Sequence, residues 1–142
     1  NGYVVIEAID DTVCFNGWTK FEGKCYYIIN YQTNWDNCNN YCTTLSNGAS
    51  MLCIQNSDQN SYIQALLYGV TSIGYNAVGS PGNFYWVPGC SSSYTNWMEG
   101  EPSDVDGVEL WGSMDLSGQW NDDYNNPDYY CACEMSSFTA AP

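Results

Sequence analysis

The amino-acid sequence predicts an α+β domain with two helices, small antiparallel sheets and a long irregular region, held together by disulfide bonds. Eight cysteines in 142 residues are typical of a disulfide-bonded domain in an oxidising compartment. Apolar residues recur at helical spacing in the first half of the chain. The second half is rich in glycine, proline, serine and asparagine before it ends in β-prone runs. The length fits one domain.

We expect an N-terminal extension over residues 1–13, one folded domain over residues 14–135 and a C-terminal tail over residues 136–142. Within the extension, Tyr3 to Ile6 is short and β-prone. We favour an extra strand laid on the edge of the domain. The alternative is a segment that pairs with a neighbouring subunit and so makes a homo-oligomer.

The first helix is predicted between a cap at Thr33 or Asn34 and Ser46, with a stop at Asn47-Gly48. It follows a buried strand over residues 26–29. One face of the helix is apolar, because these residues recur at helical spacing: Trp35, Cys38, Cys42 and Leu45.

The second helix is predicted from a cap at Ser57 through Tyr68, after a short buried strand over residues 51–54. Asp58 lies in its first turn and Gly69 follows its end, as is typical of helix termini. The expected inward face consists of Tyr62, Ile63, Leu66 and Leu67.

Few helices or strands are expected between Gly74 and Asp106, where glycine, proline, serine and asparagine dominate. An irregular stretch of this length in a compact domain is usually functional. Three closing strands are predicted after it, over residues 110–114, 119–122 and 129–134.

The charge is strongly one-sided, with sixteen acidic residues against Lys20 and Lys24 and a net charge of −14. Binding to nucleic acid or to an anionic membrane needs cationic side chains, so we exclude both classes of partner. No apolar run is long enough to cross a bilayer, so no membrane insertion is expected. No signal-peptide pattern is found either, and we expect a mature, secreted chain.

An acidic segment without counter-charges runs from Tyr94 to Asp122. Carboxylates gathered in this way either spread into water or share a cation, and Ca²⁺ prefers such oxygen ligands. The sequence therefore predicts a Ca²⁺-binding loop. Its acids are Glu99, Glu101, Asp104, Asp106, Glu109, Asp115 and Asp122.

Three motifs in this segment resemble the sugar-binding calcium site of C-type lectins: Glu101-Pro102-Ser103, Glu109 and Trp120-Asn121-Asp122. The loop motif of that family is E-P-N in mannose-type members and Q-P-D in galactose-type members. The steps of eight residues from Glu101 to Glu109 and twelve from Glu109 to Asn121 agree with mannose-binding members. Further family marks over residues 14–135, among them Trp35, Trp86 and Cys133-Glu134, imply the long form of the C-type lectin-like fold.

The resemblance implies a set of site residues. The metal ligands would be Glu101, Ser103, Glu109, Asn121 and Asp122, with Pro102 after a cis peptide bond. In the family, two vicinal sugar hydroxyls complete the shell of the ion. Sugar would then contact Glu101, Ser103, Glu109 and Asn121.

Ser103 departs from both family motifs, and this affects sugar choice. Serine can donate or accept, so it imposes less direction on a sugar hydroxyl than asparagine does. Some family members with E-P-S bind galactose with the help of a nearby aromatic ring, and Trp111 is the candidate here. We expect galactose-type sugars to bind at least as well as mannose-type ones. The other interpretation of Trp111, which we favour, is core filling where relatives have a cysteine.

The family resemblance also assigns the disulfides Cys14–Cys25 and Cys42–Cys133. A further family bridge is lost, because its positions hold Trp111 and Asn125. Four cysteines remain, and their pairing is left open between two disulfides and free buried thiols. The expected pairs are Cys38–Cys131, beside Cys42–Cys133 if helix and strand are parallel as in the family, and Cys53–Cys90.

The resulting hypothesis is a secreted, calcium-dependent lectin whose partners are glycans or glycoconjugates. The alternative is a structural or self-assembling extracellular protein with this fold and no essential sugar binding, which the high net charge and thirteen tyrosines also suit. An enzyme such as a glycosidase with paired carboxylates is disfavoured. The chain has no histidine to act as a general base, and its acids are expected to hold the ion.

Overall fold

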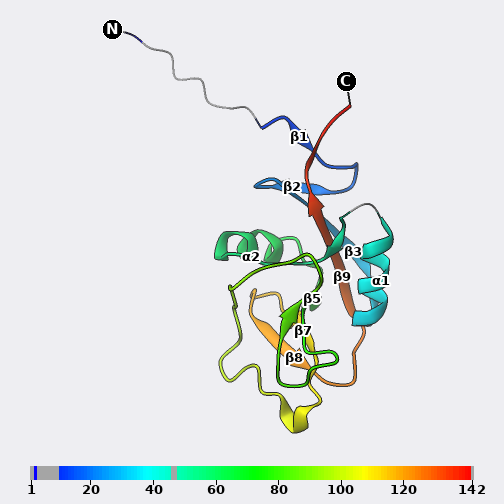
Figure 1. The fold of residues 1–142 in the computed structure, drawn as a ribbon, viewed down its shortest axis with the longest axis vertical. Helices are drawn as coiled ribbons and strands as arrows, with labels where there is room; N and C mark the ends of the chain where they lie inside the picture. The colour runs from blue at the N-terminus through cyan, green and yellow to red at the C-terminus, as the bar shows by residue number, and fades with distance from the viewer. Residues whose placement is uncertain (1, 3–9, 46–47, 142) are drawn as a thin grey trace.

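The computed structural model describes residues 2, 10–45 and 48–141. The predicted strand at Tyr3 to Ile6 and the predicted end of the first helix at Ser46 and Asn47 lie outside these residues. In Figure 1 the described residues 10–13 lie toward the top and the irregular loops lie at the bottom. None of the described helices has the length and apolar character needed to span a lipid bilayer.

The described elements confirm an α+β fold with two α-helices. The helices are α1 (Trp35–Leu45) and α2 (Ser57–Gln64), with a short 3-10 helix, η1, at Val105–Gly107. The strands are β1 (Thr12–Val13), β2 (Thr19–Phe21), β3 (Lys24–Thr33), β4 (Ser50–Met51), β5 (Thr71–Asn76), β6 (Tyr85–Trp86), β7 (Trp111–Met114), β8 (Trp120–Asp123), β9 (Tyr129–Ser136) and β10 (Phe138–Thr139).

The main sheet has the order β2-β3-β9-β5-β7-β8, with β4 added to β9 and β6 added to β5. The long strands β3 and β9 of this sheet pair antiparallel, and they lie between α1 and α2 in Figure 1. Strands β7 and β8 continue the sheet toward the loop region as an antiparallel pair. The sheet therefore links the two helices to the acidic loop.

A separate two-stranded sheet lies close to the chain ends. Strand β1 pairs with β10, with Thr12 opposite Thr139 and Val13 opposite Phe138. The Phe15 and Phe138 rings lie 4.7 Å apart beside this pair. The segment that we expected to be only a C-terminal tail thus contains a strand, which the end of the N-terminal extension completes.

All eight cysteines form disulfides: Cys14–Cys25, Cys38–Cys131, Cys42–Cys133 and Cys53–Cys90. The open question about the last four cysteines is therefore resolved in favour of pairing. Cys38 and Cys42 lie one turn apart on α1, and Cys131 and Cys133 lie on one face of β9. The two disulfides are consequently neighbours, with 4.0 Å between the Sγ atoms of Cys42 and Cys131.

Two predicted element boundaries were wrong. The N-cap of α2 is Asn56 and not Ser57, because the Asn56 side chain accepts from the Gln59 N–H. The helix ends at Gln64 rather than Tyr68, and Leu66 and Leu67 follow it while still packing partly against the core.

The strand predicted over residues 51–54 is regular only over Ser50–Met51. Beyond Met51, the backbone groups of this segment form hydrogen bonds with partners other than the β9 backbone. The Leu52 carbonyl accepts from the Gly74 N–H, and the Cys53 N–H donates to Glu134. Leu52, Cys53 and Ile54 are buried all the same, so the predicted burial holds without the strand.

Trp120 occupies the part of the core next to the loop region. Its ring is fully buried, and its Nε1–H donates to the Asn60 side chain over 2.9 Å. The rings of Trp86, Tyr94 and Trp97 all meet it edge-on, with centroids 5.6 to 6.0 Å away. The residues that follow Trp120 on β8 are therefore anchored next to a tightly packed part of the core.

Candidate metal centre

The irregular region returns twice to β8 and is hydrogen-bonded to it each time. Met98 N–H donates to the Trp120 carbonyl, and Glu101 N–H in turn donates to the Met98 carbonyl. At the other end of the loop, Leu110 N–H donates to the Asp123 carbonyl. These backbone contacts bring the regions around residues 101 and 109 to the same strand.

Three carboxylates meet where the loop returns. Oxygen atoms of Glu101, Glu109 and Asp122 all lie within 4.8 Å of one another. Asp122 is 1% exposed, and the two glutamates are half-buried. The Glu101–Pro102 peptide bond is cis, as the resemblance implied. The structure thus brings together three acids that are separated by up to 21 residues in the sequence.

Ser103 lies among these acids and links them. Its Oγ–H donates to Glu109 Oε2 over 2.5 Å, and its N–H lies 3.0 Å from Asp122 Oδ1 and 2.9 Å from Glu101 Oε2. The Asp104 N–H donates to Asp122 Oδ2 over 2.7 Å. Burial and the neighbouring Glu101 raise the pKa of Asp122 above its ordinary value, and these backbone donors only partly oppose the rise.

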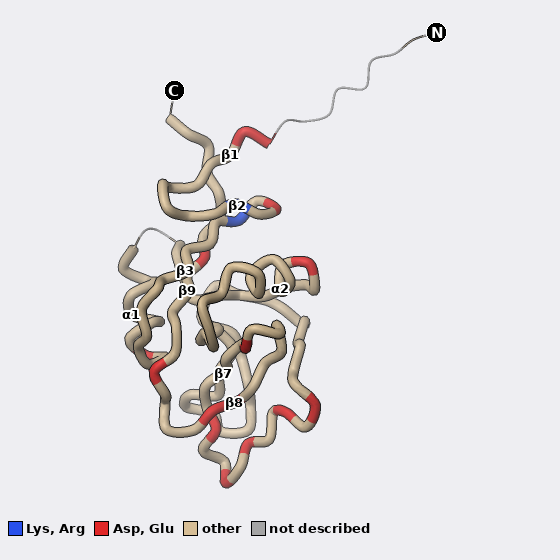
Figure 2. Tube along the Cα trace, turned by 180° about the vertical axis from the view of Figure 1, so that it is seen from behind, with Lys and Arg blue, Asp and Glu red and all other residues tan. Residues whose placement is uncertain are grey.

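Both cations of the chain lie far from this cluster. Lys20 pairs with Asp10, and Lys24 pairs with Glu134. Figure 2 shows blue at β2 and red positions along the loop at the opposite end of the molecule. No lysine therefore neutralises the three carboxylates.

Asn121 is the one predicted ligand that has no described hydrogen bond with the carboxylate cluster. Its Nδ2 donates to Asp123 Oδ1 over 3.1 Å. A carboxylate can only accept, so the amide nitrogen of Asn121 must face Asp123 and its Oδ1 must point elsewhere. Asp123 is itself fixed by hydrogen bonds from Ser113 (2.6 Å) and Tyr129 (2.8 Å).

Sequence reasoning missed Asp123, although a signal for it existed. Residues 121 and 123 lie on the same face of a β-strand, since side chains alternate. An acceptor two residues after a predicted amide ligand was therefore a candidate for orienting that amide.

Trp111 packs partly buried against the core cluster that contains Trp35, Cys42 and Val87. Its Nε1 atom is buried and has no hydrogen-bond partner among the described residues. This packing agrees with core filling, the interpretation that the sequence favoured.

The donor set fits a hard cation. Three carboxylates, a hydroxyl and an amide oxygen are the ligand types of Ca²⁺, and no thiol or imidazole is among them. Asp104 Oδ1 is also buried without a hydrogen-bond partner in the described structure, which adds to the uncompensated negative charge. A divalent cation would balance much of this charge.

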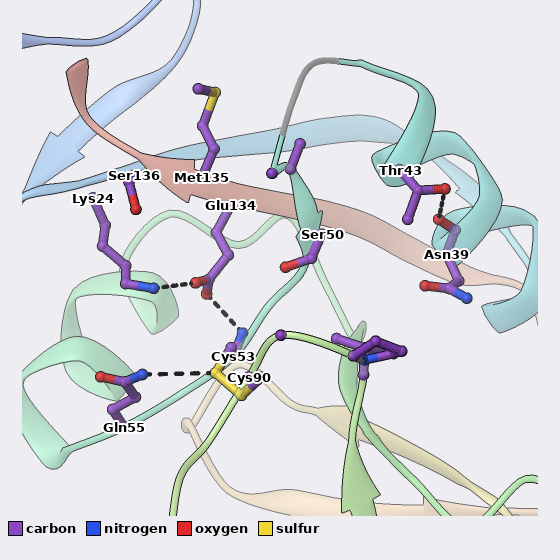
Figure 3. Close-up of a pocket in the computed structure, with 15 residues that line it drawn as sticks. Lys24, Asn39, Thr43, Ser50, Cys53, Gln55, Cys90, Glu134, Met135 and Ser136 are labelled. Atoms are coloured by element: carbon purple, nitrogen blue, oxygen red, sulfur yellow. Dashed lines mark hydrogen bonds and ion pairs between the residues drawn. A yellow bond between two sulfur atoms is a disulfide. The ribbon is translucent and has the colours of Figure 1, made fainter. Parts of the chain in front are cut away.

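A cavity of about 440 Å³ lies elsewhere in the molecule, between β9, α1 and the Cys53–Cys90 disulfide (Figure 3). Its buried carboxylate, Glu134, already accepts from Lys24 Nζ over 2.8 Å and from the Cys53 N–H over 2.6 Å. Burial raises the pKa of Glu134, although Lys24 opposes the rise. Because its charge is paired, this cavity lacks the unmatched charge that marks the loop site.

Comparison with known proteins gives a consistent result. The family model for the lectin C-type domain matches residues 31–135. Lectin BRA-3 of Megabalanus rosa is 26% identical over 98% of this chain and 90% of its own length. C-type lectin domain family 4 member M of Nomascus concolor is 32% identical over 85% of this chain, which spans only 31% of that protein.

The solved structure of a calcium-independent type II antifreeze protein superimposes with a TM-score of 0.82 at 22% identity. The match covers 89% of this chain and 97% of that one, and it supports the fold alone. The family model, by contrast, matches well over half of the chain, including the acidic loop and β8. This chain therefore belongs to the C-type lectin domain family.

Proposed function

We propose that this domain is a secreted, calcium-dependent carbohydrate-binding lectin. The observation that supports it most is the group of three carboxylates, from Glu101, Glu109 and Asp122, that meet within 4.8 Å without a cationic neighbour. Members of the family bind sugars, and BRA-3 is itself named a lectin. The fold is shared with an antifreeze protein described as calcium-independent, so the proposal rests on this chain's own residues.

Each predicted ligand has a defined task in this proposal. Glu101, Glu109 and Asp122 supply charge, and Ser103 and Asn121 supply neutral oxygen atoms. Bound calcium would provide a Lewis-acidic centre whose open positions accept two vicinal hydroxyls of a sugar. Glutamate can only accept hydrogen bonds, so Glu101 and Glu109 fix the direction of the sugar hydroxyl protons.

Ser103 leaves sugar choice less constrained than asparagine would. Its hydroxyl group can donate or accept, whereas the Nδ2 of an asparagine only donates. We therefore propose that galactose-type sugars bind at least as well as mannose-type ones. The Ser103→Asn variant is expected to shift preference toward mannose.

The experiment is retention of the purified protein on immobilised galactose and mannose, in calcium and in chelator. We expect retention in calcium, release by chelator, and loss of retention in the Glu101→Gln variant. Glu99→Gln is the matched control, because Glu99 is an exposed acid in the same loop and lies outside the carboxylate group. Retention that chelator leaves unchanged would refute the calcium-dependent mechanism.

A further inference from the structure

One long part of the chain is almost free of charge. Residues 25–57 hold a single charged residue, Asp36, although the chain has eighteen charged residues in all. This span includes most of β3 and all of α1. Asp36 lies at the start of α1, where its Oδ2 accepts from Asn126 Nδ2 over 2.7 Å. In Figure 2 α1 is mostly tan, whereas the loop at the far end of the molecule carries several red positions.

A groove of about 370 Å³ lies between β3 and α1. Its lining comes from β3, α1 and β9 and contains no charged residue: Ile29, Tyr31, Thr33, Asn37, Tyr41 and Cys131. Tyr31 is 67% exposed and Tyr41 is 43% exposed. The groove therefore offers uncharged, partly aromatic surface to a partner.

The outer edge of β3 borders this groove and has unused hydrogen-bonding groups. Along its inner side, β3 pairs with β9. On its outer side, β2 pairs only with Lys24, Cys25 and Tyr26. No described strand covers this edge over residues 27–33. Such an edge presents unpaired N–H and C=O groups to which another strand can be added.

The sequence of this edge offers little protection against pairing. Proteins commonly protect an exposed edge with charged side chains or proline, and residues 27–33 contain neither. A bulge between Ile29 and Gln32 does interrupt the register with β9. Regular pairing is therefore expected at residues 27–29, with the exposed Tyr31 just beyond them.

Charge decides which partner fits this surface. A basic partner would be attracted to the carboxylates of the loop rather than to an uncharged groove. A second copy of the chain brings a net charge of −14, so it can approach closely only through a surface with little charge, such as this one. Two identical strand edges can also pair antiparallel about a twofold axis, because each offers the same pattern of donors and acceptors.

We propose that two copies of this chain dimerise through the outer edge of β3 and the groove beside it. Residues 27–29 of the two copies pair antiparallel, so that the main sheet continues across the dimer. Tyr31 and Tyr41 pack between the copies, in agreement with the enrichment of tyrosine at protein interfaces. The dimer requires neither calcium nor sugar, so it is independent of the proposed function.

Salt should strengthen this dimer. Two chains that each carry −14 repel one another, and salt screens this repulsion over about 10 Å at 0.1 M and about 3 Å at 1 M. A contact made of backbone hydrogen bonds and uncharged side chains gains from the screening, whereas a contact made of salt bridges would weaken. The dissociation constant of the dimer should therefore fall as the salt concentration rises.

Sedimentation equilibrium of the full chain in chelator, at low and at high salt, tests the dimer. Tyr31→Lys should raise the dissociation constant roughly tenfold or more, because it places a charge in the groove, although it lowers the net negative charge. Tyr124→Lys is the matched control. It makes the same change of charge at a residue that is 65% exposed and lies outside the groove, and it should dimerise at least as well as the wild type.

Hydrogen exchange locates the pairing. Amide protons on the outer edge of residues 27–29 should gain protection as the protein concentration rises, and Tyr31→Lys should remove this gain. Val5→Lys, in the N-terminal extension, should leave the dimer intact. A wild type that stays monomeric at high salt would overturn the proposal and make an extended peptide from another protein the candidate occupant. A dimer that Tyr31→Lys leaves unchanged, or that Val5→Lys abolishes, would place the interface elsewhere.

Discussion

Removal of one of the two neighbouring disulfides between α1 and β9 should cost much less stability than its sequence separation suggests. Cys38–Cys131 and Cys42–Cys133 span 93 and 91 residues. In the chain-entropy treatment, a single cross-link over such a distance stabilises the fold by about 4.6 kcal/mol. The two bonds are not independent, however, because each already restrains the chain around the other.

With one of these bonds in place, the second closes only a small ring. Their cysteines are four residues apart on α1 and two residues apart on β9. A ring of about six residues contributes about 2 kcal/mol. Losing either bond should therefore cost about 2 kcal/mol, and losing both should cost about 7 kcal/mol. Cys53–Cys90 spans 37 residues and has no such neighbour, so its loss should cost about 4 kcal/mol.

The assay is equilibrium urea unfolding at 25 °C of variants in which both cysteines of a bond are replaced by alanine. The set contains each single-bond variant, the variant without both neighbouring bonds, and the variant without Cys53–Cys90 as the comparison. The expected order places the Cys53–Cys90 loss above either neighbouring loss, despite its shorter span. Additive costs for the two neighbouring bonds, each as large as the cost for Cys53–Cys90, would show that the two bonds stabilise the fold independently.

Three other predictions concern buried carboxylates and Ser103. In chelator, thermal stability should rise as the pH falls from 7 toward about 4, because the raised pKa values of Asp122 and Glu134 mean that the folded chain binds protons more readily than the unfolded one. In calcium the loop site should show the opposite trend, since protons compete with the ion, and melting curves over this pH range check both. Asp123→Ala should weaken calcium binding about 10- to 100-fold, because Asn121 loses the partner that orients it; unchanged affinity by calorimetry would contradict this. In a galactose–mannose competition assay, Ser103→Asn should raise the relative affinity for mannose, and an unaltered ratio would show that position 103 does not set sugar choice.

Much of the fold was predictable because its signals are local. The helical spacing from Trp35 to Cys42 predicted α1, and the Asn34 side chain does accept the Asn37 N–H at its start. The β1–β10 pair was not predictable in this way, because Thr12 and Thr139 meet across almost the whole chain. The early end of α2 also reflects tertiary packing, which lets Leu66 and Leu67 reach the core without a helical backbone.

The meeting of the three acids was predictable to the extent that they belong to a spaced motif. The motif residues Glu101, Glu109 and Asp122 do meet, and Ser103 lies between them. The groove lined by Val105, Val108 and Tyr124 could not be predicted from the sequence, because the exposure of these side chains depends on how the loop turns at η1.

Isothermal titration of the chelator-treated protein with calcium tests whether Glu101, Glu109 and Asp122 hold a calcium ion. We predict one ion per chain, strongly weakened binding in Glu101→Gln and wild-type binding in Glu99→Gln. A hundredfold excess of calcium over its dissociation constant should stabilise the fold by about 2.7 kcal/mol, visible as a rise of several degrees in Tm. A titration without binding, or an equal loss of binding in Glu99→Gln and Glu101→Gln, would show that these three carboxylates hold no calcium.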